Sequence, residues 1–247
     1  MIELKSAKEI ELMRQAGRIV AGLLGTVTKL VRPGIKTKEL DEAAAAFLKR
    51  AGAQPAFLGY RGFPATICVS INEEVVHGIP GERAVRDGDV VSIDAGGILH
   101  GFYADAATTI LVGSVSADAR RLTETTRRAL EAGIAQAVVG RRVSDISHAV
   151  QGVVEAEGFG IVRDFVGHGI GRALHEDPPI PNFGPPNVGL RLTAGMVLAI
   201  EPMVTLGRYE VKLLDDGWTA VTRDGSLAAH FEHTVAVTDH GPQLLTH

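Results

Sequence analysis

Five side chains suited to metal binding stand in apolar or glycine-rich surroundings: Asp94, Asp105, His168, Glu201 and Glu232. Asp94 ends the run Val-Val-Ser-Ile, Glu201 ends Met-Val-Leu-Ala-Ile, and Glu232 precedes His-Thr-Val-Ala-Val. Runs this rich in apolar and β-branched residues predict buried strands. A carboxylate at the end of a buried strand carries a large desolvation cost unless a positive charge lies beside it. Because too few basic residues are near to pair with all four acids, we predict a divalent metal.

The donor set also indicates the kind of metal. Four carboxylates and one imidazole suit hard or borderline divalent ions such as Mn, Fe(II) or Co. A structural zinc prefers cysteine and histidine, and the chain has one cysteine, Cys68. Four carboxylates carry too much negative charge for one ion, so we expect two ions about 3.5–4 Å apart that hold a hydroxide between them. Such a centre is suited to hydrolysis.

The two aspartates are separated by a glycine pair, Gly96-Gly97. This spacing predicts a hairpin that brings Asp94 and Asp105 onto adjacent strands. The alternative is a solvated turn with two surface acids, which is the common situation of aspartate near glycine.

His168 stands among Gly167, Gly169 and Gly171, and these glycines predict a backbone that comes close to a ligand. The alternative is a flexible loop with an incidental histidine. Pro202 favours an extended conformation for the preceding Glu201.

Two further histidines, His77 and His175, flank the set and precede Gly-Ile-Pro and Glu-Asp-Pro-Pro respectively. Each could donate a hydrogen bond to a substrate carbonyl or to the oxyanion that develops from it. The alternative for each is an ordinary surface histidine.

The elements that must position these residues follow from periodicity, capping residues and glycines. The pattern predicts helices over 7–30, 38–50, 117–139 and 144–157, strands over 66–71, 90–94 and 104–112, and a long loop over 177–187. A faint internal repeat relates Gly34 and Gly52 to Gly140 and Gly158 at one offset. This repeat predicts two α/β halves that face each other, with a site between them.

Composition places the chain among cytoplasmic, well-packed soluble proteins. It has 247 residues, of which 45% are hydrophobic and 22% charged, with a formal net charge of −4. This mild acidity gives no reason to expect nucleic-acid binding. A single cysteine excludes an intrachain disulfide and fits a reducing compartment. The first residues lack the apolar core of a signal peptide, and no membrane-spanning run of about 18 apolar residues is present.

Seven segments together resemble the type I methionine aminopeptidases, in the short bacterial form, of the M24 or pita-bread metallopeptidases. They are His77–Pro80, Ser92–Asp94, Tyr103–Asp105, Gly167–Gly171, Leu174–Glu176, Ile200–Met203 and Phe231–Thr234. The resemblance runs from about Ser6 to about Leu245. It implies an α+β pita-bread (creatinase/aminopeptidase) fold, with two pseudo-symmetric α/β halves around a central metal site. A single catalytic domain would span 1–247, with halves of about 1–112 and 113–247.

The resemblance also implies roles for the site residues. Asp94 would hold one of two divalent ions (Co, Mn, Fe(II), Ni or Zn), and His168 and Glu201 the other, while Asp105 and Glu232 bridge both. Glu201 would in addition shuttle a proton for the attacking hydroxide. His175 would polarise the scissile carbonyl, and His77 would contact the substrate amide near the leaving group.

A methionine pocket is implied at six positions, and a soft apolar pocket suits a thioether. The positions are Phe57, Tyr60, Phe63, Cys68, Leu174 and Trp218. The alternative, for Phe57 and Leu174 above all, is that they are ordinary core residues. These two also depart from the family pattern, in which a smaller and a larger side chain respectively are common. His230 takes a place often held by glutamine.

The implied activity is removal of the initiator methionine, so the implied partner is the N-terminal Met of nascent polypeptides. We expect transient ribosome association, no specific nucleic acid, no membrane and a monomer. One alternative is an Xaa-Pro aminopeptidase or dipeptidase of the same fold, although those relatives usually carry an additional N-terminal domain. Another is a non-catalytic histone- or RNA-binding module, but such relatives lose the ligands that are intact here.

Overall fold

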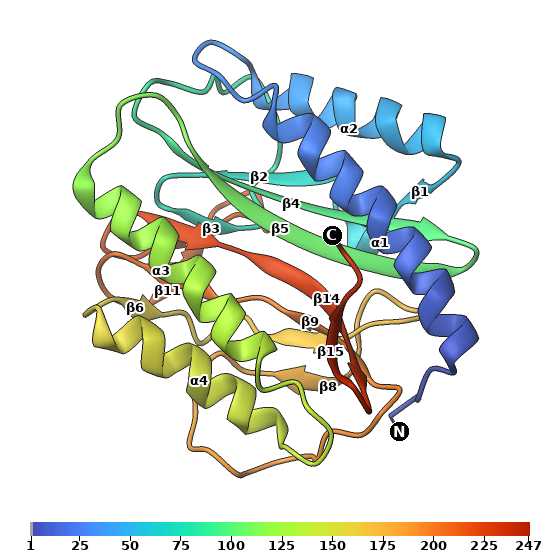
Figure 1. Ribbon diagram of the computed structural model, residues 1–247. Helices are drawn as coiled ribbons and strands as arrows, with labels where there is room; N and C mark the ends of the chain where they lie inside the picture. Colours follow the sequence, from blue (N-terminus) through green and yellow to red (C-terminus); the bar gives the residue numbers. More distant parts are fainter. Residues whose placement is uncertain (1) are drawn as a thin grey trace.

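The structure is a computed structural model that describes residues 2–247. Its helices are α1 (Ala7–Thr28), α2 (Thr37–Ala51), the 3-10 turn η1 (Tyr60–Gly62), α3 (Ala117–Ile134) and α4 (Val143–Ala156) (Figure 1). Its strands are β1 (Gln54–Pro55), β2 (Ile67–Ile71), β3 (Glu74–Val76), β4 (Val90–Leu99), β5 (Phe102–Leu111), β6 (Gly160–Ile161), β7 (Gly167–Gly169), β8 (Glu176–Ile180), β9 (Val197–Ile200), β10 (Met203–Thr205), β11 (Val211–Leu213), β12 (Ala220–Thr222), β13 (Ala228–His230), β14 (Glu232–Thr238) and β15 (Gly241–Leu244).

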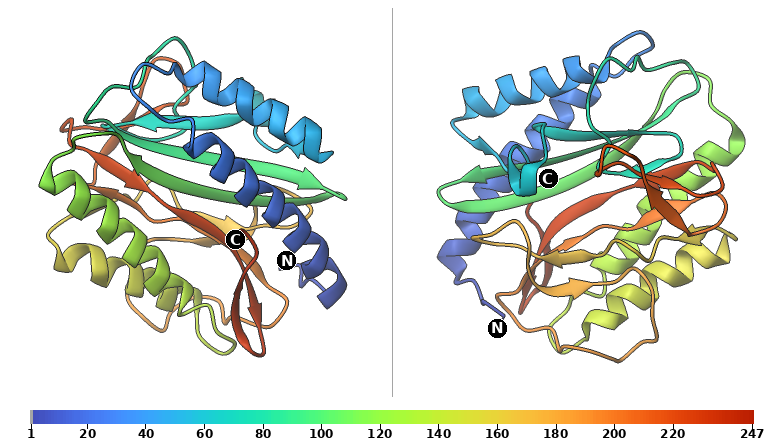
Figure 2. Two further views of the ribbon diagram at one scale, coloured as in Figure 1. Left: turned by 45° about the horizontal axis from the view of Figure 1, so that its top comes forward. Right: turned by 180° about the vertical axis from the view of Figure 1, so that it is seen from behind.

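A nine-stranded sheet forms the centre of the molecule. Its order is β1-β4-β5-β14-β9-β7-β8, with β2 paired to β4 and β15 paired to β14. Two three-stranded sheets, β13-β10-β6 and β11-β12-β3, complete the fold. Figure 2 shows the helices on one side of the large sheet, with α1 and α2 over one half and α3 and α4 over the other. The predicted α+β class and paired α/β halves are therefore present.

Helix α1 follows from its sequence pattern. Ser6 caps it, and the Glu9 side chain accepts a hydrogen bond from the Ser6 backbone N–H at 2.9 Å, which closes the predicted capping box. Buried apolar residues at helical spacing, such as Met13, Val20 and Val27, form its inner face, which packs on β4 and β5. None of the helices in residues 2–247 is long and apolar enough to cross a membrane.

Helix α3 ends at Ile134, five residues before the predicted end at Val139. The segment that follows forms turns, in which the Val138 N–H bonds to the Gln136 carbonyl at 2.7 Å. The β-branched pair Val138-Val139 weakly disfavours a helix, and the chain must reverse here to begin α4.

The predicted hairpin of β4 and β5 is present, and β4 extends further than predicted. The turn is at His100 and Gly101, which both have positive φ (52° and 76°), whereas Gly96 and Gly97 lie inside β4. A Cβ on Gly96 would come within 2.7 Å of the Phe57 ring. The predicted hairpin with Asp94 and Asp105 on adjacent strands is confirmed. The glycine pair itself lies within β4 and allows close packing there.

Strand β8 occupies the start of the segment predicted as a loop over 177–187. It contains Pro178 and Pro179, which have no N–H to donate to a neighbouring strand. Because β8 lies at the edge of the sheet, one side of the strand needs no such donor. The two prolines are therefore compatible with strand structure at this edge position.

Candidate active site

Five neighbouring strands of the large sheet supply the five predicted metal ligands. The ligands are Asp94 on β4, Asp105 on β5, Glu232 at the start of β14, Glu201 directly after β9, and His168 on β7. In the sheet these strands stand in the order β4-β5-β14-β9-β7. The site therefore lies at the centre of the sheet, where the two halves of the fold meet.

Strand register brings the acids of the first three strands together. Asp94 is opposite Ala107 on β5, and Ala107 is opposite Glu232 on β14. The small Ala107 therefore separates two carboxylates in one row across the sheet. Asp105 lies two residues from Ala107, and alternate residues of a strand point to the same face. All three acids consequently share one face.

The same argument places the other two ligands on this face. Ile200 pairs with His233, so Glu201 comes next to Glu232 at the end of β9. His168 pairs with Ala199, which is two residues before Glu201. The sheet thus carries all five ligands on one surface.

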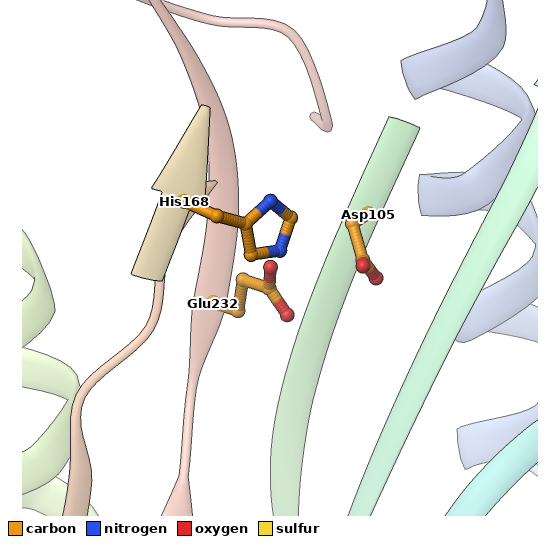
Figure 3. Close-up of side chains that lie close together, drawn as sticks. All are labelled: Asp105, His168 and Glu232. Atoms are coloured by element: carbon orange, nitrogen blue, oxygen red, sulfur yellow. The ribbon is translucent and has the colours of Figure 1, made fainter. Parts of the chain in front are cut away.

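Distances confirm that the ligand atoms converge. One ligand atom from each of Asp105, His168 and Glu232 lies within 4.8 Å of the other two, and Figure 3 shows these side chains pointing toward one another from β5, β7 and β14. Glu201 Oε1 is 3.5 Å from His168 Nε2. The Asp94 side chain is within hydrogen-bond reach of that of Asp105.

Burial controls the electrostatics of this cluster. Desolvation raises the pKa of Asp105 to about 7. Burial, reinforced by neighbouring carboxylates, raises the pKa values of Asp94, Glu201 and Glu232 well above their ordinary values. Without a counter-charge the ionised cluster is therefore strongly disfavoured.

The donor set fits a divalent cation. Buried carboxylate oxygens of Asp94, Asp105 and Glu232 have no hydrogen-bond partner, and such orphaned acceptors are costly. Nδ1 of His168 lies 2.9 Å from the Gly169 carbonyl oxygen, to which it donates, and this leaves Nε2 free to bind a metal. Burial lowers the pKa of His168 to about 4, so its imidazole is neutral near pH 7, as a ligand must be.

The glycines around His168 are required by close backbone packing, which differs from the predicted approach of the backbone to a ligand. A Cβ on Gly167 would lie 2.4 Å from the Ala199 carbonyl oxygen, and one on Gly169 would lie 2.1 Å from the Asp177 carbonyl oxygen. The glycines therefore let the backbones of β9 and of the β8 segment come close on either side. His168 is held by this close packing and not by a flexible loop.

A cavity of about 330 Å³ opens onto the ligands. It is lined by the five ligands, by His77 and His175, and by all six positions of the expected methionine pocket, together with Arg61, Asp164, Phe165 and Val166. The lining combines acidic with aromatic residues, and among the latter the rings of Phe63 and Trp218 meet edge to face at 5.1 Å. The structure thus gathers every predicted site residue around one space.

Cys68 lies in β2 directly opposite Asp94. Burial, assisted by the nearby carboxylates, raises the pKa of its thiol well above 9.0. Because a neutral thiol is a poor nucleophile, the surroundings favour a pocket wall over a reactive group.

The two flanking histidines are positioned by aromatic neighbours. Nδ1 of His175 lies 2.8 Å from the Tyr60 hydroxyl, and its ring centroid is 4.2 Å from that of His168. His77 meets Phe165 edge to face at 5.3 Å, and its φ of 61° is unusual for a residue other than glycine. Burial lowers the pKa of His77 to about 4, so this imidazole is neutral near pH 7.

Sequence reasoning missed the residues that anchor the His175 loop. The Glu176 carboxylate accepts backbone hydrogen bonds from Arg172 (2.8 Å) and Ala173 (3.2 Å) and forms an ion pair with Lys5. Lys5 lies far away in the sequence, so no local signal could have linked the two. Phe165 was also missed, although a search for aromatic residues next to the Gly-His-Gly segment would have found it.

Comparison with known proteins gives the family. Residues 11–239 match metallopeptidase family M24. A methionine aminopeptidase from Clostridium perfringens is 54% identical over 246 residues, which cover 100% of this chain and 99% of the relative. Methionine aminopeptidase 1 from Bacillus subtilis is also 54% identical, with the same coverage. The chain therefore belongs to metallopeptidase family M24, whose members use divalent metal ions, and the resemblance to methionine aminopeptidases is confirmed.

Solved structures agree with this family and with the pita-bread fold. The crystal structure of a methionine aminopeptidase from Thermotoga maritima is 46% identical and has a TM-score of 0.98, covering 100% of this chain and 99% of the other. A prolidase from Pyrococcus furiosus is 23% identical with a TM-score of 0.81, and this chain spans 65% of it. The second likeness concerns the fold alone.

Proposed function

We propose that this chain is a methionine aminopeptidase that removes the initiator methionine from nascent proteins. The single observation that carries the proposal is the cavity, whose lining combines the five candidate metal ligands with the aromatic and apolar side chains of the expected methionine pocket. A metallopeptidase needs both a hydrolytic centre and a place for the residue that it releases. The relatives that match the full length are named methionine aminopeptidases, which supports the same reading.

We propose two divalent ions at the centre, of which Co, Mn, Fe(II), Ni and Zn are candidates. Asp94 would hold one position and His168 and Glu201 the other, with Asp105 and Glu232 between them. When bound, divalent ions act as Lewis acids and lower the pKa of water in the site. The four buried carboxylates supply the negative charge that two such ions require.

Glu201 is the proposed proton carrier. Its carboxylate takes a proton from the attacking water and passes it to the amine that leaves. In the metal-free site burial raises the pKa of Glu201 well above its ordinary value, and a bound cation would favour the ionised carboxylate, which is the form that accepts a proton.

The two histidines are proposed to contact the scissile peptide. Because Nδ1 of His175 is engaged by Tyr60, its Nε2 is the nitrogen available to donate to the substrate carbonyl oxygen. His77 would contact the substrate amide near the leaving group. Trp218 packs against both Phe63 and His77, with ring centroids 5.1 and 6.2 Å apart, so the methionine pocket and His77 are mechanically linked.

The methionine side chain is proposed to enter the space among Phe57, Tyr60, Phe63, Cys68, Leu174 and Trp218. Aromatic rings and a neutral thiol offer polarisable contacts to a thioether sulfur.

We further propose that the chain is a single catalytic domain over 1–247, with halves of about 1–112 and 113–247, that works as a cytoplasmic monomer. One continuous sheet that crosses both halves supports the single domain. Since nascent chains are the proposed substrate, transient ribosome association follows from it.

A direct test uses purified protein loaded with Mn, Fe(II) or Co in turn and the peptides Met-Ala-Ser and Ala-Pro-Ala. We expect free methionine from the first peptide and little cleavage of the second. Preference for Ala-Pro-Ala would instead indicate an Xaa-Pro peptidase. Absence of methionine with all three metals would contradict the proposal.

A further inference from the structure

A second imidazole lies close to Glu201, near the carboxylate oxygen that His168 does not approach. His230, the last residue of β13, is 1% exposed. Its Nε2 is 3.8 Å from Glu201 Oε2, whereas His168 Nε2 is 3.5 Å from Glu201 Oε1. The carboxylate of Glu201 therefore lies between two imidazole rings, one for each oxygen.

His230 also belongs to a second group of converging ligand atoms. One such atom from each of Glu201, His230 and Glu232 lies within 4.8 Å of the other two. This group shares Glu232 with the cluster of Asp105 and His168. The His230 Nε2 is fully buried and has no hydrogen-bond partner, which is costly for a polar atom unless something binds it.

The backbone of His230 is fixed in place by Thr109 of β5. The His230 N–H donates to Thr109 Oγ1 at 3.0 Å, and Thr109 Oγ1 donates to the His230 carbonyl at 2.7 Å. On its other side β13 pairs with β10, where His230 is opposite Met203. The ring is thus presented toward the carboxylates by two adjacent strands and not by a loose segment.

We propose that His230 is a further metal ligand, whose Nε2 binds the divalent ion that Glu201 and Glu232 hold. This inference rests on the metal centre of the proposed function and adds a nitrogen donor to its ligand set. An additional imidazole favours Co, Ni and Zn over Mn, because affinity for nitrogen donors rises along that series. The competing role is a hydrogen bond from His230 to Glu201, which would orient the carboxylate without touching the ion.

The test counts bound imidazoles directly. Protein fully loaded with Co(II) is examined by ¹H NMR in water, where each cobalt-bound imidazole gives a strongly shifted, exchangeable N–H resonance. We expect two such resonances in the natural protein, from His168 and His230, and one in His230→Gln. Glutamine can still hydrogen-bond to Glu201, so the variant separates the two roles. His148→Gln, at an exposed position of α4, is the matched control and should keep both resonances.

Calorimetric titration adds a second readout. In His230→Gln the affinity for Ni(II) and Zn(II) should fall by a larger factor than the affinity for Mn(II), because the lost donor is a nitrogen. A single resonance in the natural protein, or an equal loss for all metals with both resonances retained, would overturn the inference. The count in the natural protein decides the point even if the variant fails to fold. Failure to bind Co(II) at all would overturn the proposed metal centre as well, so the two failures are distinguishable.

Discussion

Lys5 and Glu176 form an ion pair that joins the segment before α1 to the loop that carries His175. The two side chains are only 4% and 14% exposed. Gly171 packs against this contact, because a Cβ there would lie 2.3 Å from Lys5 Cε. The beginning of the folded chain and a proposed catalytic loop are therefore held together by one buried electrostatic contact.

Lys5→Met should destabilise the protein and slow catalysis. The substitution keeps the length of the side chain but leaves the Glu176 carboxylate buried without its cation, which costs about 3 kcal/mol. The loosened His175 loop should lower kcat for Met-Ala-Ser. Urea unfolding and steady-state kinetics provide the measurements. Lys36→Met is the control, because its ion pair with Glu82 is exposed and should contribute little.

Asp105→Ala and Glu232→Ala should abolish activity together with metal binding, since each removes a carboxylate from the middle of the ligand set. His77→Ala should keep its metal while kcat falls by about 10²-fold, because it removes only a contact to substrate. Metal content by elemental analysis, paired with activity, checks both. Equal metal loss in the two kinds of variant would contradict the assigned roles.

The metal-free protein should become less stable as the pH rises from about 6.5 to about 8. Asp105 has a pKa of about 7 in the folded protein, and Asp94, Glu201 and Glu232 are also raised. The unfolded chain has already lost these protons at pH 6.5, so the folded state binds more protons and its stability falls with pH.

Histidines oppose this trend only in the lower part of the range, and less and less as the pH rises above about 6.5. Burial lowers the folded-state pKa values of His77 and His168 to about 4 and of His230 to about 3, so they are neutral in the folded state, while the unfolded chain loses its remaining histidine protons as the pH rises from about 6.5. Thermal unfolding in EDTA should show Tm falling across this range, and added Co(II) or Mn(II) should reduce the fall. A Tm that rises with pH in EDTA would count against the burial of these carboxyl groups.

Alanine substitutions at two glycines of α1 should change the free energy of unfolding in opposite directions. A Cβ on Gly17 would lie 2.1 Å from the Leu245 carbonyl oxygen, so Gly17→Ala should destabilise by about 1–3 kcal/mol. Gly25 has nothing within 4 Å of such a Cβ, so Gly25→Ala should stabilise by about 0.5–1 kcal/mol through helix propensity. Chemical denaturation of both variants gives the comparison, and a similar loss in both would refute the packing argument.

The sequence could indicate which acids lie together in the fold, because acids at the ends of apolar runs conflict with burial, and this conflict is local. Asp94, Glu201 and Glu232 are all acids that adjoin such an apolar run. The extent of β4 was underestimated because Gly96 is equally compatible with a turn and with the close approach of Phe57, and only tertiary packing decides between them. His230 stood out only as a departure from a family pattern. Its proximity to Glu201 depends on the register of three strands, which the sequence does not determine.

The position of β14 has a consequence for how the enzyme is made. This strand lies between β5 and β9, and the sheet continues from one half of the fold to the other through it. It also contributes Glu232, although it is among the last strands to be synthesised. A growing chain therefore cannot complete the ligand set until β14 has been translated, so the same late insertion that joins the two halves would switch on peptidase activity.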